Sequence, residues 1–361
     1  MEQTKKKHGY DFVLLTVILI LIAVGLVLLY STSAYNGEVK FHDTFYYLKK
    51  QSFATALGLA GMYVMAHIDY HRWERLVPLA YLVSILLLVA VLLIGDEYNG
   101  SKRWLSLGPI SFQPSEFAKV AVILFLAQYV ARHVKEMGKI KAMFKVMLFV
   151  LPAVVLVGAS NLSTAIIILG IGVVLIFSAS PNYVQFIWMG VLGSGIMGIF
   201  LALESYRLER LAIWRNPEAY EKGYQTLQGL YAIGSGGLFG QGLGASVQKL
   251  GFLPEAQNDM IFSIVCEELG LTGAVFIVVL FLILIWRFFV IATRTKDLFG
   301  SLICTGAMSH MMIQVILNIA VVTNSIPNTG ITLPFISYGG TSILFLLMEM
   351  GVVLSVSNLI E

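Results

Sequence analysis

Charged side chains are scarce in this sequence. Only 12% of the 361 residues are Asp, Glu, Lys or Arg, whereas 58% are hydrophobic and the mean hydropathy is +0.82. An ordinary soluble domain is about one quarter charged. The composition therefore excludes a water-soluble globular protein and predicts an integral membrane protein, in which the bilayer replaces a large buried core.

Other features that would indicate a function are also missing. No basic run is longer than Lys5 to Lys7, so nucleic acid is not an expected partner. The two cysteines, Cys266 and Cys304, lie in apolar runs and form neither a disulfide framework nor a metal-ligand spacing. The sequence has no nucleotide-binding motif, so any reaction must use an activated substrate. It shows no internal repeat, and hence no inverted-repeat signature of a transporter.

Long apolar runs are abundant. Ten of them are long enough to cross about 30 Å of hydrocarbon, and the first shows no signal-peptide cleavage site. They cover residues 12–33, 50–68, 77–95, 114–131, 143–159, 163–180, 184–204, 260–286, 299–323 and 334–358. Because backbone polar groups at membrane depth must be satisfied internally, these runs predict helices. We expect an all-α polytopic membrane protein with ten transmembrane helices, forming a single domain over residues 1–361.

The distribution of Lys and Arg predicts the orientation. Loops on the side of the N-terminus hold ten basic residues: Arg72, Arg75, Arg132, Lys135, Lys139, Lys141, Lys145, Arg287, Arg294 and Lys296. The short loops on the other side hold fewer. The positive-inside rule then places both termini in the cytoplasm. The segment 205–259 is expected to form a large extracytoplasmic loop.

Three acids follow that loop, at the start of the eighth run. If a helix begins near Asp259, this residue shares a face with Ser263, Glu267 lies at the edge of that face, and Glu268 points away. Asp259 could simply cap the helix, and Glu267 and Glu268 could form buried ion pairs. Alternatively, a carboxylate at the membrane boundary, its pKa raised by desolvation, is suited to act as a general base.

Residues 99–119 form a second polar cluster. Pro114 and Glu116 are typical of a helix start. Lys119 lies one turn inside an apolar run and needs a partner, which Glu116 at i−3 could provide. An internal Glu116–Lys119 pair and a contact to a ligand both stay open. Lys102 and Arg103 stand beside an aromatic residue at the expected interface, where lipid anchoring is the alternative to substrate binding.

The loop 205–259 carries a third cluster. Arg207 and Arg210 are three residues apart and would present two cations on one helical face, suited to a pyrophosphate or to lipid headgroups. Six glycines lie between Gly234 and Gly244, and their N–H groups could cradle an anion. Farther along, Gln314 and Asn318 share one face of the ninth run, where hydrogen bonds between helices would explain them.

Residues 328–342 contain further helix breakers. Pro334 and the pair Gly339–Gly340 predict a re-entrant or tightly turned segment, which must line protein or a cavity.

Four motifs together resemble the SEDS family (shape, elongation, division and sporulation), which includes FtsW, RodA and SpoVE. They are KRWLSLGPISFQPSEFAK, GLYAIGSGGLFGQGLG, FLPEAQNDMIFSIVCEELG and TLPFISYGGTS, at residues 102–119, 229–244, 252–270 and 332–342. Each motif is weak alone, but their order and spacing match the family over nearly the whole chain. The segment GLGASVQK looks more like the FtsW and SpoVE type than the RodA type.

The resemblance implies a peptidoglycan glycosyltransferase that polymerises lipid II at the outer face of the bacterial cytoplasmic membrane. Asp259 occupies the position of the family's essential acid, and we assign it as the general base that activates the acceptor hydroxyl. The transfer would invert the configuration at the anomeric carbon of the donor sugar and expel undecaprenyl pyrophosphate. Fixed cations would stabilise that leaving group, with Arg103, Lys119, Arg207 and Arg210 as candidates. By resemblance, Gln113 and Glu116 also belong to the substrate site.

Partners and cofactors follow from the resemblance alone. It implies a class B penicillin-binding protein as the transpeptidase partner, together with other division or elongation proteins. No cofactor is expected, although a divalent metal at the pyrophosphate stays open. A lipid II flippase and a non-catalytic scaffold are the alternative functions. The family's usual P-D-L-G-T reads Ser160, Asn161, Leu162, Ser163 and Thr164 here, which questions any charged role at Asn161.

Overall fold

A computed structural model of the chain describes residues 9–98, 101–107, 110–184, 186–188, 190, 195 and 211–360. Long helices dominate it. The long helices are α1 (Phe12–Phe41), α2 (Tyr46–His67), α4 (Val77–Ile94), α5 (Pro114–Arg132), α6 (Ile140–Gly158), α7 (Leu162–Ala179), α10 (Tyr224–Gly236), α11 (Ile261–Arg294), α12 (Leu298–Val322) and α13 (Gly340–Ser357). The short helical turns are α3 (Tyr70–Trp73), η1 (Val134–Glu136), η2 (Pro217–Ala219) and η3 (Glu221–Gly223).

The predicted spans agree with these helices wherever the structure describes them. Eight helices in the described part of the chain are long and apolar enough to cross a membrane: α1, α4, α5, α6, α7, α11, α12 and α13. The run 50–68 also forms a helix, α2, which is less apolar than those eight. Most of the run 184–204 lies outside the described residues. The polytopic helical fold is confirmed, while the count of ten spans stays a prediction.

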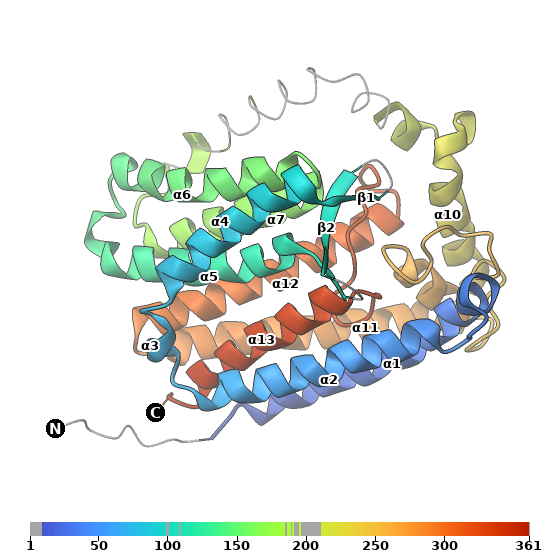
Figure 1. Cartoon of the computed structure of the whole chain (residues 1–361), viewed down its shortest axis with the longest axis horizontal. Coiled ribbons are helices and arrows are strands. Elements are labelled where there is room, and N and C mark those ends of the chain that lie inside the picture. Colours follow the sequence, from blue (N-terminus) through green and yellow to red (C-terminus); the bar gives the residue numbers. More distant parts are fainter. Residues whose placement is uncertain are drawn as a thin grey trace.

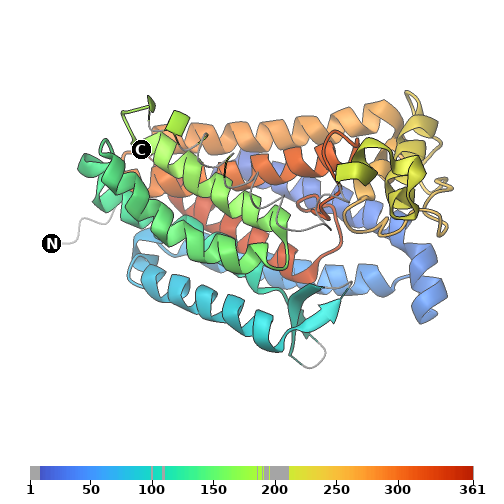
Figure 2. The same ribbon diagram turned by 90° about the horizontal axis from the view of Figure 1, so that it is seen from above.

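The long helices form one bundle with two distinct ends (Figure 1). The start of α1 and the end of α13 lie at one end, and α10 lies at the other, an arrangement that the view from above also shows (Figure 2). The most apolar stretches of α5 and α13 are 72% buried, against 22% in α4. Helices α5, α12 and α13 therefore form the interior, and α4 presents most of its surface outward.

Three short strands were not predicted. β1 (Asp96–Tyr98), β2 (Ser101–Leu107) and β3 (Ile110–Phe112) form an antiparallel sheet in the order β1-β2-β3. Leu105 pairs with Phe112 in the second ladder. The strands connect α4 to α5 at the end of the bundle where α10 lies (Figures 1 and 2). The sheet thus gives Arg103 and its neighbours a defined backbone, where the sequence suggested only an interfacial patch.

The helix that follows the loop is interrupted. Within α11, Gly270 has φ 66° and ψ −164°, a conformation that side chains with a Cβ rarely adopt. Before this break, Ile261 to Glu268 are buried on every side, whereas the stretch after it alternates between buried and exposed residues. The first segment of α11 is therefore enclosed by protein, and the second faces its surroundings as a transmembrane helix does.

Candidate active site

Asp259 lies just before α11, two residues ahead of Ile261. Its side chain is only 8% exposed, and its Oδ1 atom has no hydrogen-bond partner among the described residues. The N-cap position of α11 is Met260, and no side chain caps this helix. The interpretation of Asp259 as a helix cap is therefore wrong. A buried carboxylate oxygen without a partner is costly and needs another explanation.

The surroundings of Asp259 shift its acidity. Burial raises the pKa of this carboxyl to about 7, and the neighbouring Glu255 carboxylate adds to the rise. Its own backbone N–H and the Arg103 guanidinium act in the opposite direction and lower the pKa. A carboxylate that titrates near neutral pH is matched to accepting a proton from a substrate under physiological conditions.

Arg103 reaches this region from β2. Its Nε atom donates a hydrogen bond to the Ser160 carbonyl at 2.9 Å, and its charge acts on Asp259. The next residue, Asn161, is the N-cap of α7, and its side-chain oxygen accepts from the Thr164 N–H at 3.2 Å. An amide and a carboxylate can both serve as a cap. Asn161 therefore has a structural role that requires no charge.

Lys119 lies fully inside the bundle, 2% exposed. Its Nζ atom forms an ion pair with Glu116 at 3.1 Å, which confirms the predicted internal pair. A second contact joins Nζ to Gln314 Oε1 on α12, also at 3.1 Å. Gln113 precedes α5 and donates to the Ser115 hydroxyl at 3.1 Å. Whether Glu116, Lys119 or Gln113 contacts a substrate stays a prediction.

The segment between α12 and α13 joins these polar groups to Asp259. Gln314 Nε2 donates to the Thr332 carbonyl at 3.0 Å. One turn later, Asn318 Nδ2 donates to the Ile331 carbonyl at 2.6 Å and to the Asp259 carbonyl at 2.9 Å. The predicted hydrogen bonding of Gln314 and Asn318 is confirmed. Their contacts link α12 to the backbone that carries Asp259.

Unpartnered polar atoms gather around the same backbone. Asp259 Oδ2 lies beside Gly330, where an added Cβ would be 3.7 Å from it. The buried Asn258 Oδ1, Ser263 Oγ and Thr329 Oγ1 atoms have no hydrogen-bond partner in the described parts of the chain. These atoms belong to residues adjacent to Asp259, one turn after it, and adjacent to Gly330. Such a concentration of unsatisfied groups is typical of a site that binds a polar ligand.

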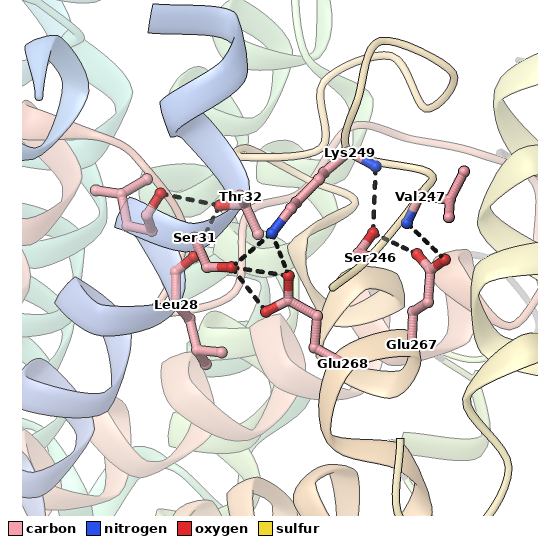
Figure 3. A network of polar contacts seen from close by, with 9 residues as sticks. Leu28, Ser31, Thr32, Ser246, Val247, Lys249, Glu267 and Glu268 are labelled. Carbon is pink, nitrogen blue, oxygen red and sulfur yellow. Dashed lines mark hydrogen bonds and ion pairs between the residues drawn. The ribbon is translucent and has the colours of Figure 1, made fainter. Parts of the chain in front are cut away.

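Glu267 and Glu268, in contrast, are fully occupied (Figure 3). Glu268 pairs with Lys249 Nζ at 2.6 Å and accepts from the Ser31 hydroxyl of α1 at 2.7 Å. Glu267 accepts from the Ser246 hydroxyl and from the Val247 N–H at 3.1 Å. The alternative of a buried ion pair is confirmed for Glu268. Both acids attach the loop segment 246–249 to the first segment of α11.

The glycine-rich segment serves the same attachment. The N–H groups of Gln241 and Gly242 donate to the Glu267 and Glu268 carbonyls at 2.8 and 3.0 Å. A side chain at Gly240 would collide with the Glu268 carbonyl. These two N–H groups are therefore not free to cradle an anion. They satisfy carbonyls that the break in α11 leaves without helical partners.

Arg207 and Arg210 lie outside the described residues. Among the residues that are described, no group of three His, Cys, Asp or Glu side chains is arranged to hold a metal ion.

His310 and Glu349 were not recognised from the sequence. The signal that could have found them is the presence of ionisable residues in the apolar runs of α12 and α13.

The fold and the site define a polytopic helical membrane protein with a buried, partly unsatisfied carboxylate at the end of the bundle opposite the termini. The chain belongs to the FtsW/RodA/SpoVE family of cell cycle proteins, whose sequence profile matches residues 11–360. The resemblance seen in the four motifs is thereby confirmed.

Relatives and solved structures agree over almost the full length. Stage V sporulation protein E of Bacillus subtilis (strain 168) is 40% identical, with 98% of this chain and 99% of the relative aligned. A probable peptidoglycan glycosyltransferase FtsW of Geobacter sp. (strain M18) is 35% identical, with 98% of each covered.

Two solved structures share the fold. A chain of a peptidoglycan synthase complex, described as coordinating polymerization and crosslinking, has a TM-score of 0.82 and 29% identity, covering 97% of this chain and 98% of that one. The rod shape determining protein RodA of Thermus thermophilus has a TM-score of 0.71 and 27% identity, with 97% of each chain covered.

Proposed function

We propose that this protein, a peptidoglycan glycosyltransferase of the family, polymerises lipid II into glycan strands with Asp259 as the general base. The observation that carries the proposal is the state of this carboxyl: it is buried, its Oδ1 has no partner among the described residues, and its pKa is raised to about 7. Relatives of the chain are named as probable peptidoglycan glycosyltransferases.

The reaction balances with a single base. Asp259 takes the proton from the acceptor sugar's hydroxyl, and the oxygen forms a bond to the anomeric carbon of the donor. The bond from that carbon to the pyrophosphate breaks, and the electron pair leaves with undecaprenyl pyrophosphate. A pyrophosphate leaves without being protonated by a second acid, unlike the sugar alcohol that glycosidases must expel. The donor carries its own driving force, so no ATP is required.

Fixed cations near Asp259 would bind the departing charge. Arg103 is the described cation with a direct electrostatic effect on Asp259. Lys119 is neutralised by Glu116, so this pair would present a polar surface with a weaker field. Gln113 would donate to substrate oxygens, and Arg207 and Arg210 would complete the site from the loop. A divalent cation shared with the pyrophosphate would use substrate oxygens as ligands.

The positions of the first and last helices and of the loop support the proposed orientation. The start of α1 and the end of α13 lie at the end of the bundle opposite α10 (Figures 1 and 2). With the termini in the cytoplasm, Asp259 and the extracytoplasmic loop face the outer side of the bacterial membrane, where strands grow. A class B penicillin-binding protein would crosslink these strands, and other division or elongation proteins would join the complex. A similar chain occurs in a synthase that combines polymerization with crosslinking.

Purified protein and lipid II test the proposal directly. The wild-type protein should convert lipid II into glycan polymer, and Asp259→Asn should bind lipid II but form no polymer. Asn has almost the same shape as Asp and cannot accept the proton. If the variant polymerises at the wild-type rate, Asp259 is not the base. Translocation of lipid II across vesicles without polymer would support a flippase, and normal wall synthesis in cells that carry only the variant would support a scaffold.

A further inference from the structure

A stripe of three buried polar residues runs along α12. His310, Gln314 and Asn318 are spaced four residues apart and are exposed by 1%, 2% and 0%. Residues at this spacing lie on one face of a helix. Asn318 and Gln314 contact the segment next to Asp259, and His310 contacts Glu349 on α13. The stripe thus connects the catalytic region to a histidine–carboxylate pair that the proposed reaction does not use.

The orientation of the Gln314 amide determines where a proton lies. Its Nε2 atom donates to the Thr332 carbonyl at 3.0 Å, so its Oε1 atom faces Lys119 Nζ at 3.1 Å and His310 Nε2 at 3.0 Å. An amide oxygen can only accept hydrogen bonds. Both of its neighbours must therefore donate, and His310 carries a proton on Nε2.

The other ring nitrogen requires a second proton. His310 Nδ1 lies 2.9 Å and 3.2 Å from the two oxygens of Glu349, a carboxyl that is 3% exposed. If Nδ1 held only a lone pair and Glu349 were ionised, two acceptors would face each other. One proton must lie between them, on the ring or on the carboxyl. In both cases the pair has no net charge, which suits its place inside the bundle.

We propose that His310 and Glu349 share one proton and act as positioning residues for the transfer reaction. The proton keeps the Nε2–H of His310 directed at Gln314 Oε1. Gln314 in turn holds the Lys119 ammonium and the Thr332 carbonyl. This inference rests on the proposed function, because the groups it positions are those assigned to the substrate site and its neighbourhood.

The contacts of Gln314 continue to Asp259, the proposed general base. Thr332 and Ile331 are consecutive, and Asn318 joins the Ile331 carbonyl to the Asp259 carbonyl. Gly330, the preceding residue, lies against Asp259 Oδ2. A shift of Thr332 would therefore move the backbone on which Asp259 rests. The charged groups around this network in the described residues are Lys119 with Glu116 and Glu349 with His310, and, at its Asp259 end, Arg103 and Glu255.

A simpler explanation is that the pair only joins α12 to α13. Paired substitutions separate the two explanations. His310→Leu or Glu349→Leu alone leaves a buried polar partner, so both should lower the melting temperature. The double variant H310L/E349L replaces the pair with apolar side chains and should recover most of that stability. In the double variant Gln314 Oε1 keeps the Lys119 donor but has lost the His310 donor that orients the amide, so kcat should stay about tenfold or more below wild type, with a smaller change in KM.

A conservative variant tests the shared proton. In Glu349→Gln, the new amide can donate to Nδ1, which leaves the proton of neutral His310 on Nε2. This variant should keep at least half of the wild-type kcat. If Glu349→Gln folds but is as slow as the double variant, the shared proton is not needed as proposed. If H310L/E349L has the wild-type kcat, the pair only joins α12 to α13, and the proposal is overturned.

A matched control pair lies at the start of α1, at the end of the bundle opposite α10. Arg287 of α11 pairs with Asp11, the N-cap of α1. The double variant D11L/R287L should change the melting temperature without lowering kcat. Asp259→Asn is measured in parallel on lipid II. Its failure to lose activity would refute the proposed function, whereas an unaffected H310L/E349L beside an inactive Asp259→Asn would refute only the positioning role.

Discussion

Two groups of acids within ten residues of each other are treated differently by the fold. Asp259 has a buried oxygen without a partner in the described structure, and its pKa is raised to about 7. Glu267 and Glu268 are also buried, at 3% and 1% exposed, but hydrogen bonds and Lys249 satisfy them. Burial alone therefore does not distinguish the proposed base from the other two acids. The difference is whether the protein supplies the partners or leaves a position for a substrate.

The same comparison explains how the site is held. The partnered acids attach the loop to the first segment of α11 (Figure 3), and this segment begins directly after Asp259. Stable, satisfied groups thus keep an unsatisfied group in place. Functional sites are commonly supported in this way, because interactions elsewhere in the fold must offset the destabilisation caused by unsatisfied groups in the site.

The largest expected effect is on the reaction rate. Asp259→Asn should lower the turnover of lipid II by about 10² to 10⁴-fold, the usual contribution of a general base. Glu267→Gln, which can keep the contacts with Ser246 and Val247, should have a much smaller effect. Initial rates of polymer formation at equal amounts of folded protein make the comparison. Equal losses in the two variants would remove the distinction between the acids.

For stability we expect the opposite: substitution of a partnered acid should destabilise the fold, and substitution of Asp259 should not. Glu268→Leu leaves the buried Lys249 ammonium without its partner and should destabilise the fold by about 3–5 kcal/mol. The double variant K249M/E268L should recover much of this loss. Asp259→Asn should instead raise the melting temperature at pH 8, because it removes a buried charge that lacks a partner. Thermal unfolding in detergent measures all three, and a destabilised Asp259→Asn would contradict the account of Asp259.

The pH dependence of activity sharpens the assignment of the base. A general base acts only when ionised, and the pKa of Asp259, the proposed base, is about 7. Activity should therefore rise up to about pH 7, approach a plateau above it, and fall about tenfold for each unit below it. Rates measured from pH 5 to 8.5 check this. A profile that is flat down to pH 5 would show that Asp259 is not the titrating base.

The raised pKa also has a consequence for stability. The carboxyl binds its proton more tightly in the folded protein than in the unfolded chain, where its pKa is about 3.9. Binding of this proton therefore favours the folded state. This contribution to stability is complete below about pH 3.9 and is lost as the pH rises through about 7. The gain in melting temperature of Asp259→Asn should therefore shrink toward pH 4.

A shift of the pH profile is a smaller test. The Glu255 carboxylate raises the pKa of Asp259, so Glu255→Gln should lower it. The midpoint of the activity profile should move to lower pH by less than about one unit. Asn258, which donates to Glu255, serves as a control: Asn258→Ala keeps the charge and should leave the midpoint nearly unchanged. A midpoint that does not move in Glu255→Gln would exclude this charge as a cause.

The smallest effect is expected at the cap of α7. Asn161→Asp keeps the side-chain oxygen that accepts from the Thr164 N–H. Its stability should stay within about 1 kcal/mol of wild type, whereas Asn161→Ala should lose about 1 kcal/mol. Thermal unfolding of both variants checks the prediction. A large change in Asn161→Asp would indicate that charge matters at this position.

Much of the site could be found from the sequence, but its contacts could not. The Glu116–Lys119 pair was predicted because i and i+3 residues meet on any helix. The partner of Glu268 is Lys249, nineteen residues earlier and in an irregular loop, so no helical spacing reveals it. Of the two alternatives left open for Asp259, the cap is excluded because the backbone places Met260 at the N-cap. Sheet β1-β2-β3 was missed because its strands are short and follow directly after a long apolar run.

The sequence by itself determined that the chain is a helical membrane protein and which side chains could carry chemistry. Apolar runs of sufficient length must form helices in a bilayer, whatever surrounds them. Only the tertiary structure decided which of these side chains has its hydrogen bonds satisfied. That depends on contacts between segments far apart in the chain, such as Gln314 with Lys119 and Asn318 with Asp259. Whether a buried carboxylate is free to accept a proton depends on whether the fold supplies its hydrogen-bond partners. A local pattern of residues does not show this.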